Sequence, residues 1–403
     1  MVKTMDLSIF DEAKEILERL ESYNHKAYFV GGCVRDMILG RKIGDIDIAT
    51  SAAPELVQQI FENVIPVGIQ HGTVIVRHNR QSYEVTTFRT DGKYSDQRHP
   101  DSVTFIQSID EDLRRRDFTI NALAMDKDGE IIDLFRGRKD IADRVIQTVG
   151  NGYERFEEDP LRIIRALRFS SQLGFTISEL TMANMKNLKH EIEGIAVERI
   201  KQEFAKFFAG EHVQSGIAYL KEMQLDHYLP VFRNHRELIH ELPDGLTPVP
   251  SFGALIALFH YLAPQITIQD WSSQWKCSNK EKRVAIDLTL ALRQYNKNGL
   301  DSWLVYCLPA ACHSSIVVLI NLLLDERVEL NDFLRLNSNL PIHSRQELAI
   351  NGHDIKQLFP SRNGGPWIKN ILNAVEFAVV TGKVDNDKND LKEWIKWNPT
   401  ATN

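Results

Sequence analysis

The chain has 403 residues, of which 43% are hydrophobic, and this is enough to bury a large core divided among several domains. No apolar run is long enough to cross a bilayer, and the N-terminal segment does not pair a basic stretch with an apolar one, so the sequence argues against a membrane protein and predicts a cytoplasmic one. The net charge of −7 does not by itself indicate a nucleic-acid partner, although arginines cluster at 114–116, 136–144 and 155–168.

Apolar periodicity and turn residues predict that the first part of the chain alternates short helices and strands. The expected elements are a helix over 9–22, a strand over 27–30, a helix over 34–39, a strand over 45–49 and a hairpin made of 73–77 and 83–89. The polar stretch 90–100 contains Gly and Pro but no apolar period, so we expect a long mobile loop there.

From residue 157 onward the apolar spacing predicts one helix after another. Breaks are expected at Gly174, Gly194, Gly210 and the Pro- and Gly-rich stretch 242–250, and the final helices at 367–380 and 391–397. The pattern predicts a multidomain α+β protein, with a small mixed-sheet domain followed by an extended all-helical arm.

The four cysteines are Cys33, Cys277, Cys307 and Cys312. They show neither CxxC pairing nor interleaved histidines, so disulfides and a structural zinc site are not expected. We interpret all four as reduced packing residues.

The sharpest functional signal is the sequence GGCVRD at 31–36, followed by DID at 45–47. A Gly31-Gly32 turn between a strand and a helix directs backbone amides and the positive helix end at one point, which suits a phosphate that Arg35 is placed to reach. Residues two apart on a strand share a face, so Asp45 and Asp47 are expected to point the same way and to bind Mg²⁺ through oxygen. Each feature alone is more often a tight turn or a solvated strand end.

Together these features resemble the DNA polymerase β nucleotidyltransferase superfamily, in which two metal ions about 3.5–4 Å apart clamp the α-phosphate during in-line attack. The resemblance implies nucleotidyl transfer, with Asp45 and Asp47 as catalytic metal ligands and Mg²⁺ as the cofactor. A third carboxylate sometimes shares the ions. Glu84 on the neighbouring predicted strand is a candidate, and an exposed strand glutamate is the ordinary alternative.

A basic cluster runs directly into an apolar segment in the sequence RRRDFTINALA at 114–124. By itself this is a charged loop ahead of a core segment. In this context it resembles the second motif of class II tRNA nucleotidyltransferases and bacterial poly(A) polymerases, which implies that Arg116 and Asp117 contact the bound nucleotide. The sequence DLFRGRKDI at 133–141 resembles their third motif, with Arg136-Gly137 where the family often has Gly-Gly.

The sequence EDPLRIIRALRF at 158–169 predicts an amphipathic helix with apolar residues on one face. Its charged face consists of Asp159, Arg162, Arg165 and Arg168. A solvated basic face is the ordinary explanation of such a pattern. The preceding motifs favour instead a resemblance to the helix that acts as an amino-acid template in the same enzymes, which implies that these four residues bind nucleotide.

The chemistry of such a template can be stated from the base edges. Cytosine and adenine both present an amine donor beside a ring-nitrogen acceptor, whereas uracil and guanine present a carbonyl beside a ring N–H. A carboxylate that only accepts, beside a guanidinium that only donates, therefore pairs with C and A and is left unpaired against U and G. Asp159 and Arg162 are the predicted pair.

The chain through about residue 210 resembles the class II, bacterial-type CCA-adding enzymes, which are tRNA nucleotidyltransferases of the DNA polymerase β superfamily. The sequence VERI at 197–200 with Glu203 resembles a fifth motif that braces the preceding helix. The resemblance implies a nucleotidyltransferase head (1–145), a neck for base recognition (146–211), a body (212–280) and a tail for tRNA binding (281–403). It also implies stepwise addition of C, C and A to tRNA from CTP and ATP, with no membrane and no required protein partner.

Three alternatives differ in function. A bacterial poly(A) polymerase usually carries a strongly basic C-terminal extension, which is not seen after Trp397. A CC-adding enzyme has a shortened loop, whereas 89–103 has full length here, and an A-adding enzyme is not distinguished by sequence. From another class, a non-catalytic tRNA-binding protein is disfavoured by the intact Asp45 and Asp47.

Overall fold

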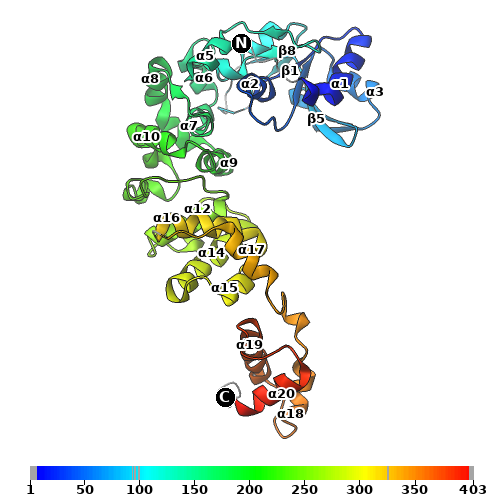
Figure 1. Ribbon diagram of the computed structural model, residues 1–403. Coiled ribbons are helices and arrows are strands. Elements are labelled where there is room, and N and C mark those ends of the chain that lie inside the picture. The colour runs from blue at the N-terminus through cyan, green and yellow to red at the C-terminus, as the bar shows by residue number, and fades with distance from the viewer. Residues whose placement is uncertain (1–6, 93, 95–96, 99, 325, 399–403) are drawn as a thin grey trace. The chain divides into compact units, whose positions relative to one another are not determined.

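The computed structural model describes residues 7–92, 94, 97–98, 100–324 and 326–398. The chain forms two compact units, residues 1–239 and 240–403, and each is described by itself (Figure 1). The first unit contains the sheet and the second is helical. The predicted class, a mixed-sheet head followed by an all-α remainder, is confirmed, while the finer division at 145, 211 and 280 stays a prediction.

The first unit is built on a seven-stranded mixed sheet with the order β3-β4-β5-β2-β1-β8-β9. Within this sheet all neighbouring strands are antiparallel except β2 and β5, which run parallel. The strands are β1 (Ala27–Val30), β2 (Asp47–Thr50), β3 (Val64–Gly68), β4 (Thr73–His78), β5 (Gln81–Thr87), β8 (Ala124–Met125) and β9 (Ile131–Ile132). The predicted hairpin is β4–β5, and its turn uses Asn79 and Arg80 at positive φ, which matches the twist of the strands.

Side chains alternate between the two faces of the hairpin. Val74, Val76 and Val85 are buried on one face, on the side where helices α1 (Asp11–Ser22) and α3 (Pro54–Ile60) pack against β4. The opposite face carries Thr73, Ile75, Glu84 and Thr86, none of which is buried, so this half of the sheet leaves one face free for a site.

Strand β2 begins at Asp47, two residues later than predicted. Its antiparallel partner β1 ends at Val30, which pairs with Asp47, because the chain turns away at Gly31. Asp45 therefore lies before the strand, and the expectation that Asp45 and Asp47 share a strand face is wrong.

The remaining helices of the first unit stack beside one another after the sheet (Figure 1). Helix α7 packs against α9 and α10, and α6 packs against α8. Their bounds, with those of the short elements between sheet and helices, are α2 (Gly32–Leu39), β6 (Arg89–Asp91), β7 (Val103–Phe105), α4 (Ile109–Arg114), α5 (Gly137–Asp143), β10 (Val145–Ile146), α6 (Gly152–Glu158), α7 (Leu161–Leu173), β11 (Thr176–Ile177), α8 (Glu179–Leu188), α9 (Val197–Phe208), α10 (Val213–Met223) and α11 (Glu237–His240).

The helix predicted across 158–169 is interrupted at its start. Helix α6 ends at Glu158, Asp159 is extended, and α7 begins only after Pro160. Proline disfavours helical backbone in the residue before it, which explains the break. Asp159 therefore belongs to the junction between two helices and not to the face of α7.

The second unit is helical, and α14 is the helix that contacts most of its neighbours, namely α12, α13, α15 and α16. Its helices are α12 (Phe252–Leu262), α13 (Ile268–Gln274), α14 (Asn279–Asn298), α15 (Ser302–Cys307), α16 (His313–Leu323), α17 (Leu330–Ser338), α18 (Gly352–Leu358), α19 (Pro366–Val380) and α20 (Lys388–Trp397). Within the described residues, no helix is long and apolar enough to span a membrane. All four cysteines are free thiols as predicted, but Cys307 is exposed and is not a packing residue.

Candidate active site

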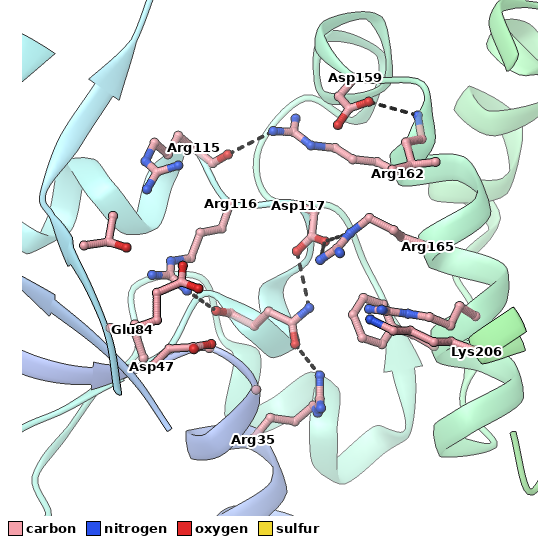
Figure 2. Close-up of a pocket in the computed structure, with 18 of the residues that line it drawn as sticks. Arg35, Asp47, Glu84, Arg115, Arg116, Asp117, Asp159, Arg162, Arg165 and Lys206 are labelled. Atoms are coloured by element: carbon pink, nitrogen blue, oxygen red, sulfur yellow. Dashed lines mark hydrogen bonds and ion pairs between the residues drawn. The ribbon is translucent and has the colours of Figure 1, made fainter. Parts of the chain in front are cut away.

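A cavity of about 730 Å³ opens between the uncovered face of the sheet, the segment 115–121 and helices α7 and α9, all within the first unit (Figure 2). Ten of the eleven predicted site residues line it: Gly31, Gly32, Arg35, Asp47, Arg116, Asp117, Asp159, Arg162, Arg165 and Arg168. The exception is Asp45, which is exposed beside the strand start. Segments more than 100 residues apart in sequence thus meet at one site.

The Gly31-Gly32 turn forms the floor of the cavity at the start of α2. Gly31 has φ +74°, a conformation that residues with a side chain rarely adopt. A Cβ on Gly31 would lie 3.0 Å from Nη1 of Arg116, so the missing side chain lets this guanidinium rest over the turn. The turn therefore combines backbone N–H groups with a cation, as an anion site requires.

Two carboxylates stand on the sheet wall. Glu84 on β5 lies opposite Asp47 in the parallel ladder between β5 and β2. Burial, then the charge of Glu84, and more weakly that of Asp45, raise the pKa of Asp47 to about 6, although Arg116 opposes the shift. The Glu84 candidate from the sequence is thus placed beside Asp47.

Arg115 and Arg116, at the start of the 115–121 segment, are hydrogen-bonded to the buried carboxylate of Asp112. Asp112 accepts hydrogen bonds from Nη2 of Arg115 at 2.8 Å and from Nη2 of Arg116 at 3.2 Å. Burial alone would raise the pKa of Asp112, but the two guanidinium groups outweigh it and lower the pKa. Asp112 therefore fixes where both arginines enter the cavity.

Asp117 connects the sheet side of the cavity to α7. Its Oδ2 accepts from Nε of Arg165 at 2.8 Å, and its Oδ1 accepts from Nδ2 of Asn121 at 3.3 Å. Although burial would raise the pKa of Asp117, Arg165 and then Arg162 lower it to about 2. Asn121 in turn accepts at 2.6 Å from Arg35, whose other nitrogens donate to Asp36, so the phosphate contact predicted for Arg35 stays a prediction.

The basic face predicted for the 158–169 helix is not solvated along its length. Arg168 is only 7% exposed, lies 4.2 Å from the ring centre of Phe169, and has a pKa lowered to about 10 by burial and by Arg165. Glu203 on α9 lies 3.2 Å from Nε of Arg168 and 3.8 Å from Nη1 of Arg165. Glu203 therefore braces the arginine face of α7, in the role that the sequence resemblance implied.

Asp159 and Arg162 both line the cavity, but they are not a helix-face pair. Asp159 accepts at 2.7 Å from Nη2 of Arg199 and at 3.1 Å from the backbone N–H of Leu161. Arg162 donates to Glu158 at 2.6 Å and to the carbonyl of Arg115 at 3.4 Å. The interpretation of the two as one helical turn apart on a single face is wrong, because Pro160 separates them.

Several lining residues were missed by the sequence interpretation. Arg199 and Lys206 come from α9, where positions 199, 203 and 206 follow a helical spacing and lie on one face. The sequence shows this spacing, but it indicates site residues only if α9 is known to pack against α7. Asn121 lies within the 114–124 motif but was not assigned a role, and Thr73 and Thr86 carried no charge or motif that would have marked them.

The fold and the site define the class of protein. The model of the Poly A polymerase head domain family matches residues 27–147, and that of tRNA nucleotidyltransferase domain 2 matches residues 253–395. The first of these matches includes the strands and the 115–121 segment of the cavity, where carboxylates face arginines, and the chain is a nucleotidyltransferase.

Relatives that match along the whole chain show to which family of nucleotidyltransferases it belongs. The chain is 47% identical to the CCA-adding enzyme of Oceanobacillus iheyensis over 98% of this chain and 99% of that protein, and 43% identical to that of Anoxybacillus flavithermus over 98% of each. The crystal structure of the Bacillus stearothermophilus CCA-adding enzyme in complex with CTP superposes with a TM-score of 0.83, at 36% identity over 97% of this chain and 98% of that one. The chain belongs to the CCA-adding enzyme family, as its motifs predicted.

Proposed function

We propose that this protein adds C, C and A in turn to the 3′ end of tRNA from CTP and ATP, without a nucleic-acid template, and releases pyrophosphate. Its relatives, 47% and 43% identical along the whole chain, are CCA-adding enzymes, and the 36% identical structure holds CTP. The observation that carries the proposal is the cavity itself, in which the carboxylates of Asp47 and Glu84 face the arginines of α7. The proposal includes a cytoplasmic location and requires no protein partner.

The family implies a divalent metal, and the residues present fit one. Asp47 is half-buried, and its pKa is raised first by burial and then by the charge of Glu84, a repulsion that a cation between the two carboxylates would relieve. Among the described residues no group of three or more His, Cys, Asp or Glu is gathered closely enough to hold a metal by itself. Mg²⁺ usually takes one or two carboxylates and completes its shell with water and phosphate oxygens, so it is the cofactor we propose.

The chemistry would divide between the carboxylates and the groups that bind phosphate. Asp47, with Asp45 and Glu84 near it, would hold the metal, which when bound stabilises charge on the attacking and leaving oxygens. Beside them, at the floor of the cavity, Arg116 and the Gly31-Gly32 turn would bind the phosphates through charge and backbone N–H groups. Positioning by the protein would account for most of the remaining rate enhancement.

Asp159 and Arg162, at the N-terminal end of α7, would select the base. One accepts and the other donates, which is the order that C and A share and that U and G reverse. Each is presently held by a neighbour, Asp159 by Arg199 and Arg162 by Glu158. We propose that these neighbours orient the two side chains for the base.

The test is to incubate the protein with tRNA that lacks its 3′ CCA and with each labelled nucleotide in turn. The expected result is addition of two residues from CTP alone, and completion with one residue when ATP is also present. Repeated addition from ATP alone would instead indicate a poly(A) polymerase. Addition of A only to tRNA ending in CC would indicate an A-adding enzyme, and tRNA binding without addition would leave a non-catalytic binding protein.

A further inference from the structure

A pair of threonine hydroxyls lies on the sheet wall of the cavity. Thr73 on β4 and Thr86 on β5 stand opposite each other in the antiparallel ladder, with their Oγ1 atoms 3.1 Å apart. Both side chains are half-buried and both line the cavity. Within the described part of the chain neither hydroxyl has another hydrogen-bond partner, so after one hydrogen bond between them the pair keeps one free O–H donor and several acceptor lone pairs.

The hydroxyl pair stands next to the carboxylates. Thr86 follows Glu84 by two residues on the same face of β5, which is a distance of about 6.7 Å along the strand. Glu84 is itself paired with Asp47 across the ladder. A ligand group held at the carboxylates therefore has the two hydroxyls as its neighbours on the same wall.

Charge separates the two walls of the cavity. The cations of α7 and α9, among them Arg162, Arg165 and Lys206, lie on the helical wall. Arg89 on β6 also lines the cavity, but its Nε is 3.1 Å from Asp91 and it donates to the carbonyl of His71. Arg116 rests over the Gly31-Gly32 turn at the floor of the cavity. The part of the sheet wall formed by β4 and β5 therefore offers the Glu84 carboxylate and neutral hydroxyls, which do not suit a phosphate.

In-line attack on an α-phosphate puts the attacking hydroxyl and the leaving pyrophosphate on opposite sides of the phosphorus. Pyrophosphate is the more negative group and is attracted to Arg116, the Gly31-Gly32 turn and the cations of the helical wall, so the attacking 3′-hydroxyl belongs on the β4–β5 side of the carboxylates. In RNA the neighbouring ribose carbon carries a 2′-hydroxyl, which both donates and accepts and distinguishes RNA from DNA. A neutral hydroxyl pair beside the carboxylates matches that group.

We propose that Thr73 and Thr86 bind the 2′-hydroxyl of the terminal ribose of the RNA being extended, and that they give this enzyme its preference for an RNA primer end. The proposal deepens the function proposed above and rests on it. The two threonines act as specificity residues for the primer and not for the incoming nucleotide.

The test compares two primers, tRNA lacking CCA that ends either in its normal ribonucleotide or in the same residue with a 2′-deoxyribose. The kcat/KM for CTP addition is measured on each primer with the wild type, Thr86→Val and Thr73→Val, since valine keeps the branched shape of the strand residue. One neutral hydrogen bond contributes a factor of roughly three to ten. The preference for the ribose primer should fall by that factor in the variants, because the ribose primer slows while the deoxyribose primer does not.

A matched control is Ser82→Ala, which removes a hydroxyl two residues before Glu84 on the same face of β5, outside the cavity. It should keep the wild-type primer preference. The proposal is overturned if both threonine variants keep that preference, or if they raise the KM for CTP equally with either primer. If the wild type extends neither primer with CTP, the proposed function fails, and that outcome is distinct from both.

Discussion

Glu84 lies opposite Asp47 across the parallel ladder between β5 and β2, so two carboxylates share one wall of the cavity. Burial and the charge of Glu84 raise the pKa of Asp47 to about 6. This arrangement costs folding free energy whenever both groups are ionised, which is characteristic of a site built to bind a cation rather than to stabilise the fold.

The first prediction concerns stability without metal. A folded pKa above the unfolded value means that Asp47 stabilises the fold below about pH 4 and that this contribution is lost as the pH rises through about 6. Asp47→Asn should therefore raise the free energy of unfolding by roughly 1–3 kcal/mol at pH 7.5 in EDTA, and by much less at pH 4. Urea unfolding at the two pH values measures this. A variant that is no more stable than the wild type at pH 7.5 would contradict the pKa assignment.

The second prediction concerns catalysis. Asp45→Ala or Asp47→Ala should lower nucleotide addition by roughly a thousandfold or more, since charge stabilisation by a bound metal is worth several kcal/mol. Binding of tRNA, measured by filter retention, should change little. Substantial incorporation by the double variant in Mg²⁺ would remove both residues from the metal site. Asp45 lies before β2 and outside the cavity, so the Asp45→Ala variant tests most directly whether Asp45 takes part in metal binding.

The third prediction uses the opposite pKa shift. Arg165 and Arg162 overcome burial and hold the pKa of Asp117 at about 2, so Asp117 stabilises the fold above about pH 4 and loses this contribution as the pH falls toward 2. Asp117→Asn should cost roughly 1–3 kcal/mol at pH 7, and the difference from the wild type should shrink at pH 3. A difference that is the same at both pH values would show that packing, not the charge of Asp117, is what the substitution removes.

Much of the fold followed from local patterns. The apolar alternation and turn residues at 73–89 placed the β4–β5 hairpin, and the helical spacing after residue 157 placed the helical remainder. Strand β3 and helix α3 were missed, because they occupy the short stretch 54–68 with Pro54 and Pro66 in it and a β3 whose middle residues are exposed. Such elements are stabilised by their neighbours in the sheet and not by their own pattern.

The site was predictable by residue but not by arrangement. The motifs found Asp47, Asp117 and Arg165, because their residue types and spacing are specific. They did not reveal that Arg199, more than 30 residues after Asp159, holds that carboxylate at 2.7 Å. Partners of this kind are set by the packing of α9 on α7, which no local sequence period reports.

The fourth prediction concerns the segment between β6 and β7. Part of 90–100 lies outside the described residues, and the described part is tied at Gly92, which donates to the carbonyl of Ser102 at 2.8 Å. Its polar, Gly-containing sequence suggests a lever, and the resemblance to the family implies that the lever assists the switch from C to A. Deletion of 94–100 should therefore leave two C additions and lose the terminal A. Gel analysis with CTP alone and with CTP plus ATP measures this. Completion of CCA at the normal rate would assign the segment another role.

The last prediction tests base selection. Asp159 and Arg162 lie at the same cavity wall but are held separately, by Arg199 and by Glu158, so each substitution should act on its own hydrogen bond. A lost charged hydrogen bond costs about 1.5–3 kcal/mol, so Asp159→Ala and Arg162→Ala should each lower the preference for CTP over UTP and for ATP over GTP by roughly tenfold to a hundredfold. The measurement is the ratio of kcat/KM for each nucleotide pair.

The matched control for base selection is Lys206→Ala, because Lys206 is an exposed cation that lines the same cavity. Removing its charge should weaken phosphate binding for all four nucleotides alike and leave both ratios unchanged. Arg199→Ala should behave like Asp159→Ala, since it frees the carboxylate that the base must meet in a fixed orientation. If the Asp159 and Arg162 variants lose rate but keep the wild-type ratios, the junction of α6 and α7 supports the site mechanically and the base is selected elsewhere.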